Sequence, residues 1–187
     1  LGPKSIPEII KPTKPGILYF FKIIRHTKIT NNTISNWTGG SGAIYCFYLL
    51  SSTNNSVYYN TVSNITGTGT VYGIYSSGTT PSINSNSVSG ITTGGTVYGF
   101  YNSGTTLTMS GNTVSGLTTS GSTLYGIYDA ATGVSSVYKN IIYDLTSTNA
   151  SPSVFGLVVS TGTTQNIFNN LIGNLYAPSA SSTDAIR

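Results

Sequence analysis

The stretch Asn60-Thr-Val-Ser-Asn-Ile-Thr-Gly-Thr-Gly-Thr-Val-Tyr-Gly-Ile-Tyr75 decides the fold, because the chain repeats it. Close copies begin at Asn86 and Asn112, and looser copies begin at Asn32, Asn140 and Asn170. These six anchoring asparagines follow one another at intervals of 28, 26, 26, 28 and 30 residues. A period in this range indicates a repeat architecture, in which each unit packs on its neighbours.

Each copy carries apolar residues at the same places. The residue three places before the asparagine is Ile29, Val57, Ile83, Met109, Val137 or Ile167. The residue two places after it is Ile34, Val62, Val88, Val114, Ile142 or Ile172. The residue five places after the asparagine is Trp37, Ile65, Ile91, Leu117, Leu145 or Leu175. A fourth apolar position, in the Tyr-Gly segment, holds Phe47, Ile74, Phe100, Ile127 and Leu157. The runs are short, often β-branched and bounded by Gly, Ser, Thr and Asn, which predicts strands and turns. We therefore expect three strands per repeat, with Ile74, Val88, Val114 and Ile127 pointing inward.

The anchoring asparagine separates two strands in every copy. Asparagine tolerates the left-handed backbone that a sharp bend needs, so we expect that conformation at this position. If the coils stack at about 4.8 Å, the side chains lie above one another and form a hydrogen-bonded ladder. The predicted ladder consists of Asn32, Asn60, Asn86, Asn112, Asn140 and Asn170.

The pattern apolar-x-x-Asn-x-apolar, as in Ile83-Asn-Ser-Asn86-Ser-Val88, resembles the repeat of right-handed parallel β-helix proteins, the pectate-lyase-like architecture. The resemblance covers residues 17–187 and implies an all-β, right-handed parallel β-helix (β-solenoid) with three strands per coil and about six coils of 26–30 residues. Such repeats occur in polysaccharide lyases and hydrolases, phage tailspikes and bacterial surface proteins. The Tyr-Gly-Ile-Tyr and Ser-Gly-Thr-Thr segments are most similar to long, low-charge arrays of secreted bacterial proteins, which implies a secreted or cell-surface location in bacteria or phage.

The charge is distributed unevenly along the chain. Charged residues make up 6% of the sequence and the net charge is +4, but six of the eight basic residues lie in the first 28 positions. From residue 29 onward, Lys139 and Arg187 stand against Asp129, Asp144 and Asp184. The array therefore lacks the basic stripe that nucleic-acid binding needs. Because no apolar run approaches 18 residues, we also expect no membrane insertion.

Two regions are predicted. Residues 1–16 form a basic leader with four prolines, which we expect to be extended or irregular, solvated, and placed to cap the first coil. Residues 17–187 form the repeat array, whose first strand is Ile17–Phe21 and which ends within a coil. We interpret the chain as a fragment of a longer array. Because open strand edges pair readily with other chains, we expect identical chains to stack end to end.

Few residues are suited to catalysis. The lone histidine, His26, lies outside the regular coils, so a Ser-His-Asp site is not expected. Asp144 occupies a turn position filled elsewhere by Asn or Gly, and Asp129 follows a strand in a different column, so they do not form the carboxylate pair of a glycosidase. The acidic metal cluster and basic residue of a pectate lyase have no counterparts. Cys46 stands where other copies have glycine and is read as small, buried and inert. We predict no enzyme activity, metal or cofactor.

Two surface columns are candidates for binding. Tyrosines recur before and after the fourth apolar position, and Tyr75, Tyr101 and Tyr128 are the candidates for a flat strip that stacks on sugar rings. The alternative is that the rings stack across coils and stabilise the sheet. Thr66, Thr92 and Thr118 recur in a row similar to an ice-binding face, although threonine also simply favours strands.

The sequence as a whole predicts a non-catalytic structural solenoid: an extracellular spacer, an adhesin stalk or a filament segment. A carbohydrate-binding β-helix is the first alternative, with a polysaccharide as its partner, and an ice-binding solenoid is the second.

Overall fold

The computed structural model describes residues 17–23, 28–50 and 53–181, and these residues form eighteen short strands and no helix. The predicted leader at 1–16, His26 and the segment 182–187 lie outside the described residues. The strands assemble into three six-stranded sheets in which neighbouring strands come from successive coils. Each coil contributes one strand to each sheet, which confirms three strands per coil.

Sheet A contains β1 (Ile17–Ile23), β4 (Ala43–Leu49), β7 (Val71–Ser76), β10 (Val97–Asn102), β13 (Thr123–Asp129) and β16 (Ser153–Val159). Sheet B contains β2 (Lys28–Thr30), β5 (Ser56–Tyr58), β8 (Ser82–Asn84), β11 (Leu107–Ser110), β14 (Val134–Tyr138) and β17 (Thr164–Phe168). Sheet C contains β3 (Thr33–Thr38), β6 (Thr61–Gly67), β9 (Ser87–Thr93), β12 (Thr113–Thr119), β15 (Ile141–Ser147) and β18 (Leu171–Tyr176).

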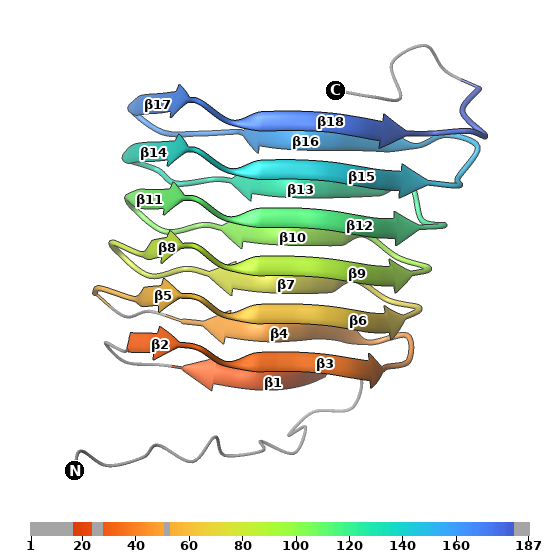
Figure 1. Ribbon diagram of the computed structural model, residues 1–187, viewed down its shortest axis with the longest axis horizontal. Coiled ribbons are helices and arrows are strands. Elements are labelled where there is room, and N and C mark those ends of the chain that lie inside the picture. Colours follow the sequence, from red (N-terminus) through yellow and green to blue (C-terminus); the bar gives the residue numbers. More distant parts are fainter. Residues whose placement is uncertain (1–16, 24–27, 51–52, 182–187) are drawn as a thin grey trace.

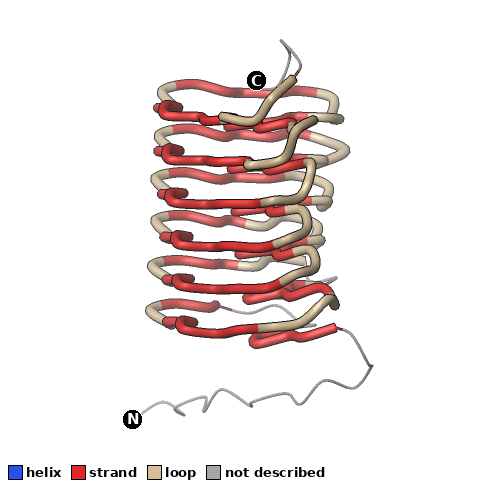
Figure 2. The backbone as a smooth tube through the Cα atoms, turned by 90° about the vertical axis from the view of Figure 1, so that its right-hand side faces the viewer, coloured by secondary structure: helices blue, strands red, loops and turns tan. Residues whose placement is uncertain are grey.

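The coils stack as a parallel, right-handed solenoid. In Figure 1 the strands of sheet C run to the right at the front, the strands of sheet A run to the left behind them, and the chain climbs from β1 to β18. The turned view in Figure 2 shows the same coils lying flat above one another. Since neighbouring strands lie about 4.8 Å apart, the five steps between six strands give the array an axial length of about 24 Å.

Equivalent residues of successive repeats face each other across the sheets. Val88 pairs with Val62 of the preceding coil and with Val114 of the following coil. Phe100 likewise pairs with Ile74 and Ile127. The register confirms that the period found in the sequence is the period of the coil.

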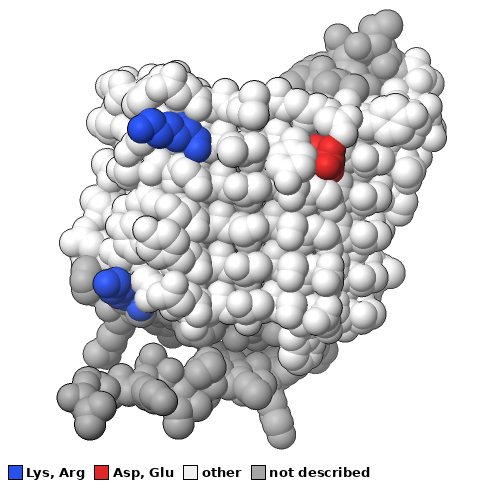
Figure 3. Space-filling model, in the orientation of Figure 1, with Lys and Arg blue, Asp and Glu red and all other residues white. Residues whose placement is uncertain are grey.

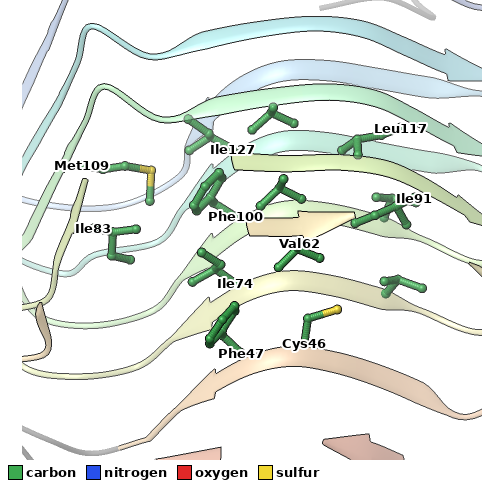
Figure 4. Packing of buried hydrophobic residues seen from close by; sticks show 14 of the residues in the cluster. Cys46, Phe47, Val62, Ile74, Ile83, Ile91, Phe100, Met109, Leu117 and Ile127 are labelled. Carbon is green, nitrogen blue, oxygen red and sulfur yellow. The ribbon is translucent and has the colours of Figure 1, made fainter. Parts of the chain in front are cut away.

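The core is a column of apolar side chains along the axis of the solenoid. Ile74, Val88, Val114 and Ile127 are completely buried, as predicted. Figure 4 shows how Phe47, Ile74, Phe100 and Ile127 follow one another up one wall of this column, with the side chains from the other sheets facing them. Because each coil adds its own apolar residues to this column, the core is extended coil by coil and does not enclose a single centre.

The left-handed backbone is not where it was expected. The anchoring asparagines do not adopt it. The residue immediately before each of them does, with φ between 55° and 62°, at Asn31, Tyr59, Ser85, Gly111, Lys139 and Asn169. These corner residues are exposed, whereas the four central ladder asparagines are buried with their side chains directed inward. The asparagine prediction was therefore wrong about the backbone and right about the side chain.

A second left-handed column bends the strands of sheet C. It contains Asn36, Asn64, Gly90, Gly116, Asp144 and Asn174, with φ between 51° and 60°. The preference for Asn, Gly or Asp at this position was predicted, and the positive φ explains it. The column lies inside the strands, however, and not in a turn between them.

Apolar positions in the outermost coils are less buried than the repeat predicted. Trp37 keeps the predicted register with Ile65, yet it is 44% exposed. At the other end of the described array, Ile167 and Ile172 are 45% and 43% exposed. These residues lie on β3, β17 and β18, the terminal strands of sheets B and C, which have a described neighbour on one side only.

Candidate functional surfaces and the polar columns behind them

The asparagine ladder runs the full height of the described array. The backbone N–H and Nδ2 of each asparagine both donate to Oδ1 of the next one, at 2.9–3.0 Å, from Asn32 through Asn60, Asn86, Asn112 and Asn140 to Asn170. The Nδ2 of Asn60, Asn86, Asn112, Asn140 and Asn170 also donates to a carbonyl oxygen of the preceding coil. The four central asparagines are at most 2% exposed. The ladder thus satisfies the buried polar groups at the corner between sheets B and C.

A second polar column lies at the opposite end of sheet C. The hydroxyl of Thr93 donates to the Gly69 carbonyl at 2.5 Å and accepts from the Gly95 N–H at 3.2 Å. Thr119 is bonded in the same way to the Gly95 carbonyl and, at 2.8 Å, to the Gly121 N–H. We did not predict this column from the sequence, although strand alternation indicates it. Because Thr92 and Thr93 are adjacent in one strand, their side chains face opposite sides of the sheet.

A third polar group is the buried pair Asn102–Asp129 at the end of sheet A. Both residues are completely buried. Oδ1 of Asp129 accepts from Nδ2 of Asn102 at 3.0 Å and from the Ala131 N–H at 2.9 Å. Oδ2 of Asp129 has no hydrogen-bond partner among the described residues.

The other carboxylate of the described array, Asp144, lies outside the wall. It is exposed at the bend of sheet C and accepts a hydrogen bond from Nδ2 of Asn174. Asp129 lies on sheet A and points into the interior of the solenoid, whereas Asp144 lies on the outer side of sheet C. The two carboxylates therefore belong to different columns and do not form a pair, as predicted from the sequence. Among the described residues no three His, Cys, Asp or Glu side chains gather where they could hold a metal ion.

Cys46 is fully buried in the core, as predicted. Burial raises the pKa of its thiol, because the thiolate would be desolvated. In the later coils the same position is glycine: a Cβ at Gly99 would lie 2.5 Å from the carbonyl oxygen of Gly126. The neutral thiol acts as a small apolar side chain.

Both tyrosine columns face outward on sheet A. The first contains Tyr45, Tyr72, Tyr98, Tyr125 and Phe155, and the second contains Tyr48, Tyr75, Tyr101 and Tyr128. All of these side chains are half-buried. Strict alternation along a strand would place the side chains of residues three apart on opposite faces. Gly73 and Ile74 interrupt this alternation, because both lie on the buried side of the strand and Gly73 is left out of the paired register. The interruption turns Tyr72 and Tyr75 to the same face.

The rings of each column stack on one another. In the first column, centroids of successive rings lie 4.6–5.0 Å apart with planes within 8° of parallel. In the second column Tyr101 stacks on Tyr75 at 4.9 Å and on Tyr128 at 5.4 Å. Rings of the two columns meet edge to face, as Tyr72 does with Tyr75 at 5.5 Å. Neighbouring rings therefore cover the ring faces, and the surface presents ring edges and hydroxyl groups.

The packing of these tyrosine rings raises the pKa of several of their phenol groups. Burial, and then the neighbouring phenolates of Tyr125, Tyr101 and Tyr128, raise the pKa of Tyr98 to about 12. The pKa values of Tyr72, Tyr101 and Tyr125 are shifted in the same direction, again mainly by burial. The hydroxyls are therefore neutral hydrogen-bonding groups at neutral pH.

The threonine column stands on the outer face of sheet C. Thr66, Thr92 and Thr118 are in register, with Thr38 before them and Thr146 after them. A parallel row of Ser35, Ser63, Ser89 and Ser115 runs beside them. Figure 3 shows few charged side chains on this face of the molecule: basic ones lie near its left edge, and an acidic one lies within the face. The outer face of sheet C therefore carries two rows of small hydroxyl side chains, one on each side of the bend column.

The described part of the chain holds no helix long and apolar enough to cross a membrane. Comparison with protein-family models, with curated proteins and with solved structures finds no match to this chain.

Proposed function

We propose that the chain is a non-catalytic structural β-solenoid, serving as a spacer, stalk or filament segment of an extracellular bacterial or phage protein. The observation that carries the proposal is the continuity of its columns. The asparagine ladder joins all six coils, and the stacked tyrosines join four of them at the surface. These repeated polar and aromatic groups are engaged with the next coil, which suits a rigid rod whose length grows with each added repeat.

Stretching single molecules between their two ends tests the spacer role. A stiff solenoid resists force and then lengthens in discrete steps as coils peel away. A released coil of about 28 residues, extended at about 3.3–3.6 Å per residue, gives steps of roughly 90–100 Å. A chain that lengthens smoothly at low force, without discrete steps, contradicts the spacer role.

End-to-end stacking is part of the same proposal, and the two ends of the ladder support it. Among the described residues the main-chain N–H of Asn170 and Oδ1 of Asn32 have no hydrogen-bond partner, so one end offers a donor and the other an acceptor. Beside the donor end, Phe168 and Leu171 are 46% and 65% exposed. A second copy stacked head to tail would extend the ladder, and because such a contact does not close, it generates filaments.

Sedimentation velocity over a range of concentrations tests the stacking. We expect growing oligomers for the chain itself, and a monomer for Ile172→Lys, which places a charge on the exposed last coil. Ser136→Lys, on the outward face of β14, is the matched control that leaves oligomers in place. If the chain stays monomeric at high concentration, stacking is excluded.

Carbohydrate binding at Tyr75, Tyr101 and Tyr128 is a second candidate, supported by the row of half-exposed hydroxyls. Because neighbouring rings cover the ring faces, a sugar would meet ring edges and hydroxyls. Changing all three residues to Phe keeps the stack and removes the hydroxyls, so we expect polysaccharide retention on a glycan array to be lost. Equal retention by the parent and this variant rules out recognition through the hydroxyls, and a parent that retains no glycan removes the candidate.

Ice binding at Thr66, Thr92 and Thr118 is a third candidate, supported by the regular spacing of these hydroxyls on a face of sheet C with few charges. Changing these residues to Lys should abolish ice shaping while the inward residues keep the fold. If the parent chain shapes no ice, this candidate is excluded.

A further inference from the structure

Eight tyrosines on β4, β7, β10 and β13 form one continuous lattice of phenol rings, which we call the tyrosine lattice; its members are Tyr45, Tyr48, Tyr72, Tyr75, Tyr98, Tyr101, Tyr125 and Tyr128. Tyr98, for example, contacts four other tyrosines: Tyr72 and Tyr125 at 4.8 Å in its own column, and Tyr101 and Tyr128 at 5.2 and 5.9 Å in the other. Every phenol of the lattice thus has at least one other phenol in direct ring contact.

Such contact prepares the rings for oxidative coupling. A one-electron oxidant removes an electron from a phenol, the hydroxyl proton leaves to solvent, and a phenoxyl radical remains. Two radicals on neighbouring rings form a carbon–carbon bond between their ortho positions, and loss of the two ortho protons to the phenolic oxygens restores both aromatic rings. With hydrogen peroxide as the oxidant and a haem peroxidase as the catalyst, two phenols and one peroxide yield one linked pair and two waters.

The lattice favours links within one chain. Stacked partners such as Tyr72 and Tyr98 are held by the register of β7 and β10, so a radical meets its partner by ring rotation, without movement of the backbone. The ring edges carry the ortho positions and face outward on a half-exposed surface, where an oxidant reaches them. A link between these two residues joins positions 26 apart in sequence and closes one coil covalently.

We propose that the tyrosine lattice is a site of oxidative phenol cross-linking, which joins adjacent coils of the solenoid by dityrosine bonds. The modification would act on the face of the described array that stacks phenols, and it would join neighbouring coils covalently. This inference does not depend on the chain being a spacer, because it requires only the stacked geometry.

The test treats the folded chain with a haem peroxidase and hydrogen peroxide, separates monomers from oligomers on a denaturing gel, and maps linked peptides by mass spectrometry. We expect dityrosine fluorescence in the monomer band. We also expect peptide pairs that have lost two hydrogens at lattice neighbours, foremost Tyr72–Tyr98, Tyr98–Tyr125 and Tyr75–Tyr101. The oxidised monomer should unfold at a higher urea concentration than the untreated chain.

Two variants separate the lattice from other tyrosines. Tyr59, Tyr143 and Tyr176 are exposed outside the lattice, so changing these three to Phe should leave the fluorescence of the monomer band unchanged. Changing the eight lattice residues to Phe should abolish it. The peptide map of the oxidised parent chain, which carries no substitution, tests the proposal independently of how the eight-residue variant folds. Links that form only between chains, or links within the monomer that avoid lattice neighbours, would overturn the proposal.

Discussion

Asn86 donates two hydrogen bonds to a single atom of Asn112: its main-chain N–H and its Nδ2 both reach Oδ1, at 2.9 and 3.0 Å. Nδ2 of Asn86 also donates to the carbonyl oxygens of Val57 and Asn84. A buried polar group left unsatisfied costs about 1–3 kcal/mol, so each ladder residue secures several such groups in two neighbouring coils. The same pair of donations to the next asparagine repeats at Asn32, Asn60, Asn112 and Asn140.

The buried hydroxyl of Thr119 should contribute more to stability than the outward-facing hydroxyl of its neighbour Thr118. Replacing Thr119 with Val keeps the shape but removes the bonds to the Gly95 carbonyl and the Gly121 N–H, so we expect the free energy of unfolding to fall by about 1–3 kcal/mol. Thr118→Val, on the outward side of the same strand, is the control and should change it by less than about 0.5 kcal/mol. Equal effects in urea unfolding would mean that the hydroxyl column does not stabilise the fold.

Asp129 should be a source of instability. Its carboxylate is fully buried, and Oδ2 has no partner among the described residues. Asp129→Asn keeps the acceptor that Asn102 and Ala131 use while removing the charge, so we expect the free energy of unfolding at pH 7 to rise by about 1 kcal/mol or more. The exposed Asp144→Asn should be nearly neutral. A loss of stability in the first variant would show that the charge is compensated.

The conformation of Tyr59 predicts a stabilising substitution. Tyr59 has a φ of 56° and is 64% exposed, so a bulky residue occupies the left-handed region and gains little from burial. Tyr59→Asn should raise the free energy of unfolding by about 0.5–1 kcal/mol, since the left-handed region costs most L-residues about 1–2 kcal/mol. Lys139→Asn, at the equivalent corner, should act in the same direction, whereas Thr61→Asn in the following strand should not. No gain at either corner would contradict the account of the backbone.

Much of the fold follows from the sequence because the repeat reports the environment of each position six times over. Inward residues such as Val88 and the ladder asparagines are recognisable without knowledge of the structure. The outward direction of both tyrosine columns was not predictable by alternation, because Gly73 and Ile74 break it within the strand. The left-handed corner was assigned to the asparagine, and not to its predecessor, because that position holds Tyr, Ser or Lys in some copies and hides its own preference.

The tyrosine lattice should also be visible in a pH titration. Tyr98 has a pKa near 12, whereas an unfolded tyrosine ionises near pH 10. The unfolded chain therefore releases its phenolic protons first, so the stabilisation from the lattice is complete below about pH 10 and is lost as the pH rises toward 12. Phenolate absorbance of the folded chain should still rise well above pH 10, and Tyr98→Phe should reduce this late rise. A single step near pH 10 in the folded chain would contradict the packing of these rings.

The most direct test of the structural role is urea unfolding of Asn86→Ala beside the parent chain. Asn86 has five side-chain hydrogen bonds to its neighbours. Its removal leaves the buried main-chain N–H of Asn60 without its acceptor and takes one donor each from the Val57 carbonyl, the Asn84 carbonyl and Oδ1 of Asn112. The account predicts a loss of about 3 kcal/mol or more, because several unpaired groups each cost about 1–3 kcal/mol. Asn64→Gly, at an exposed bend where the next coil has Gly90, should change the stability by less than about 0.5 kcal/mol. If Asn86→Ala unfolds at the same urea concentration as the parent, the ladder does not hold the coils together and the central claim is wrong.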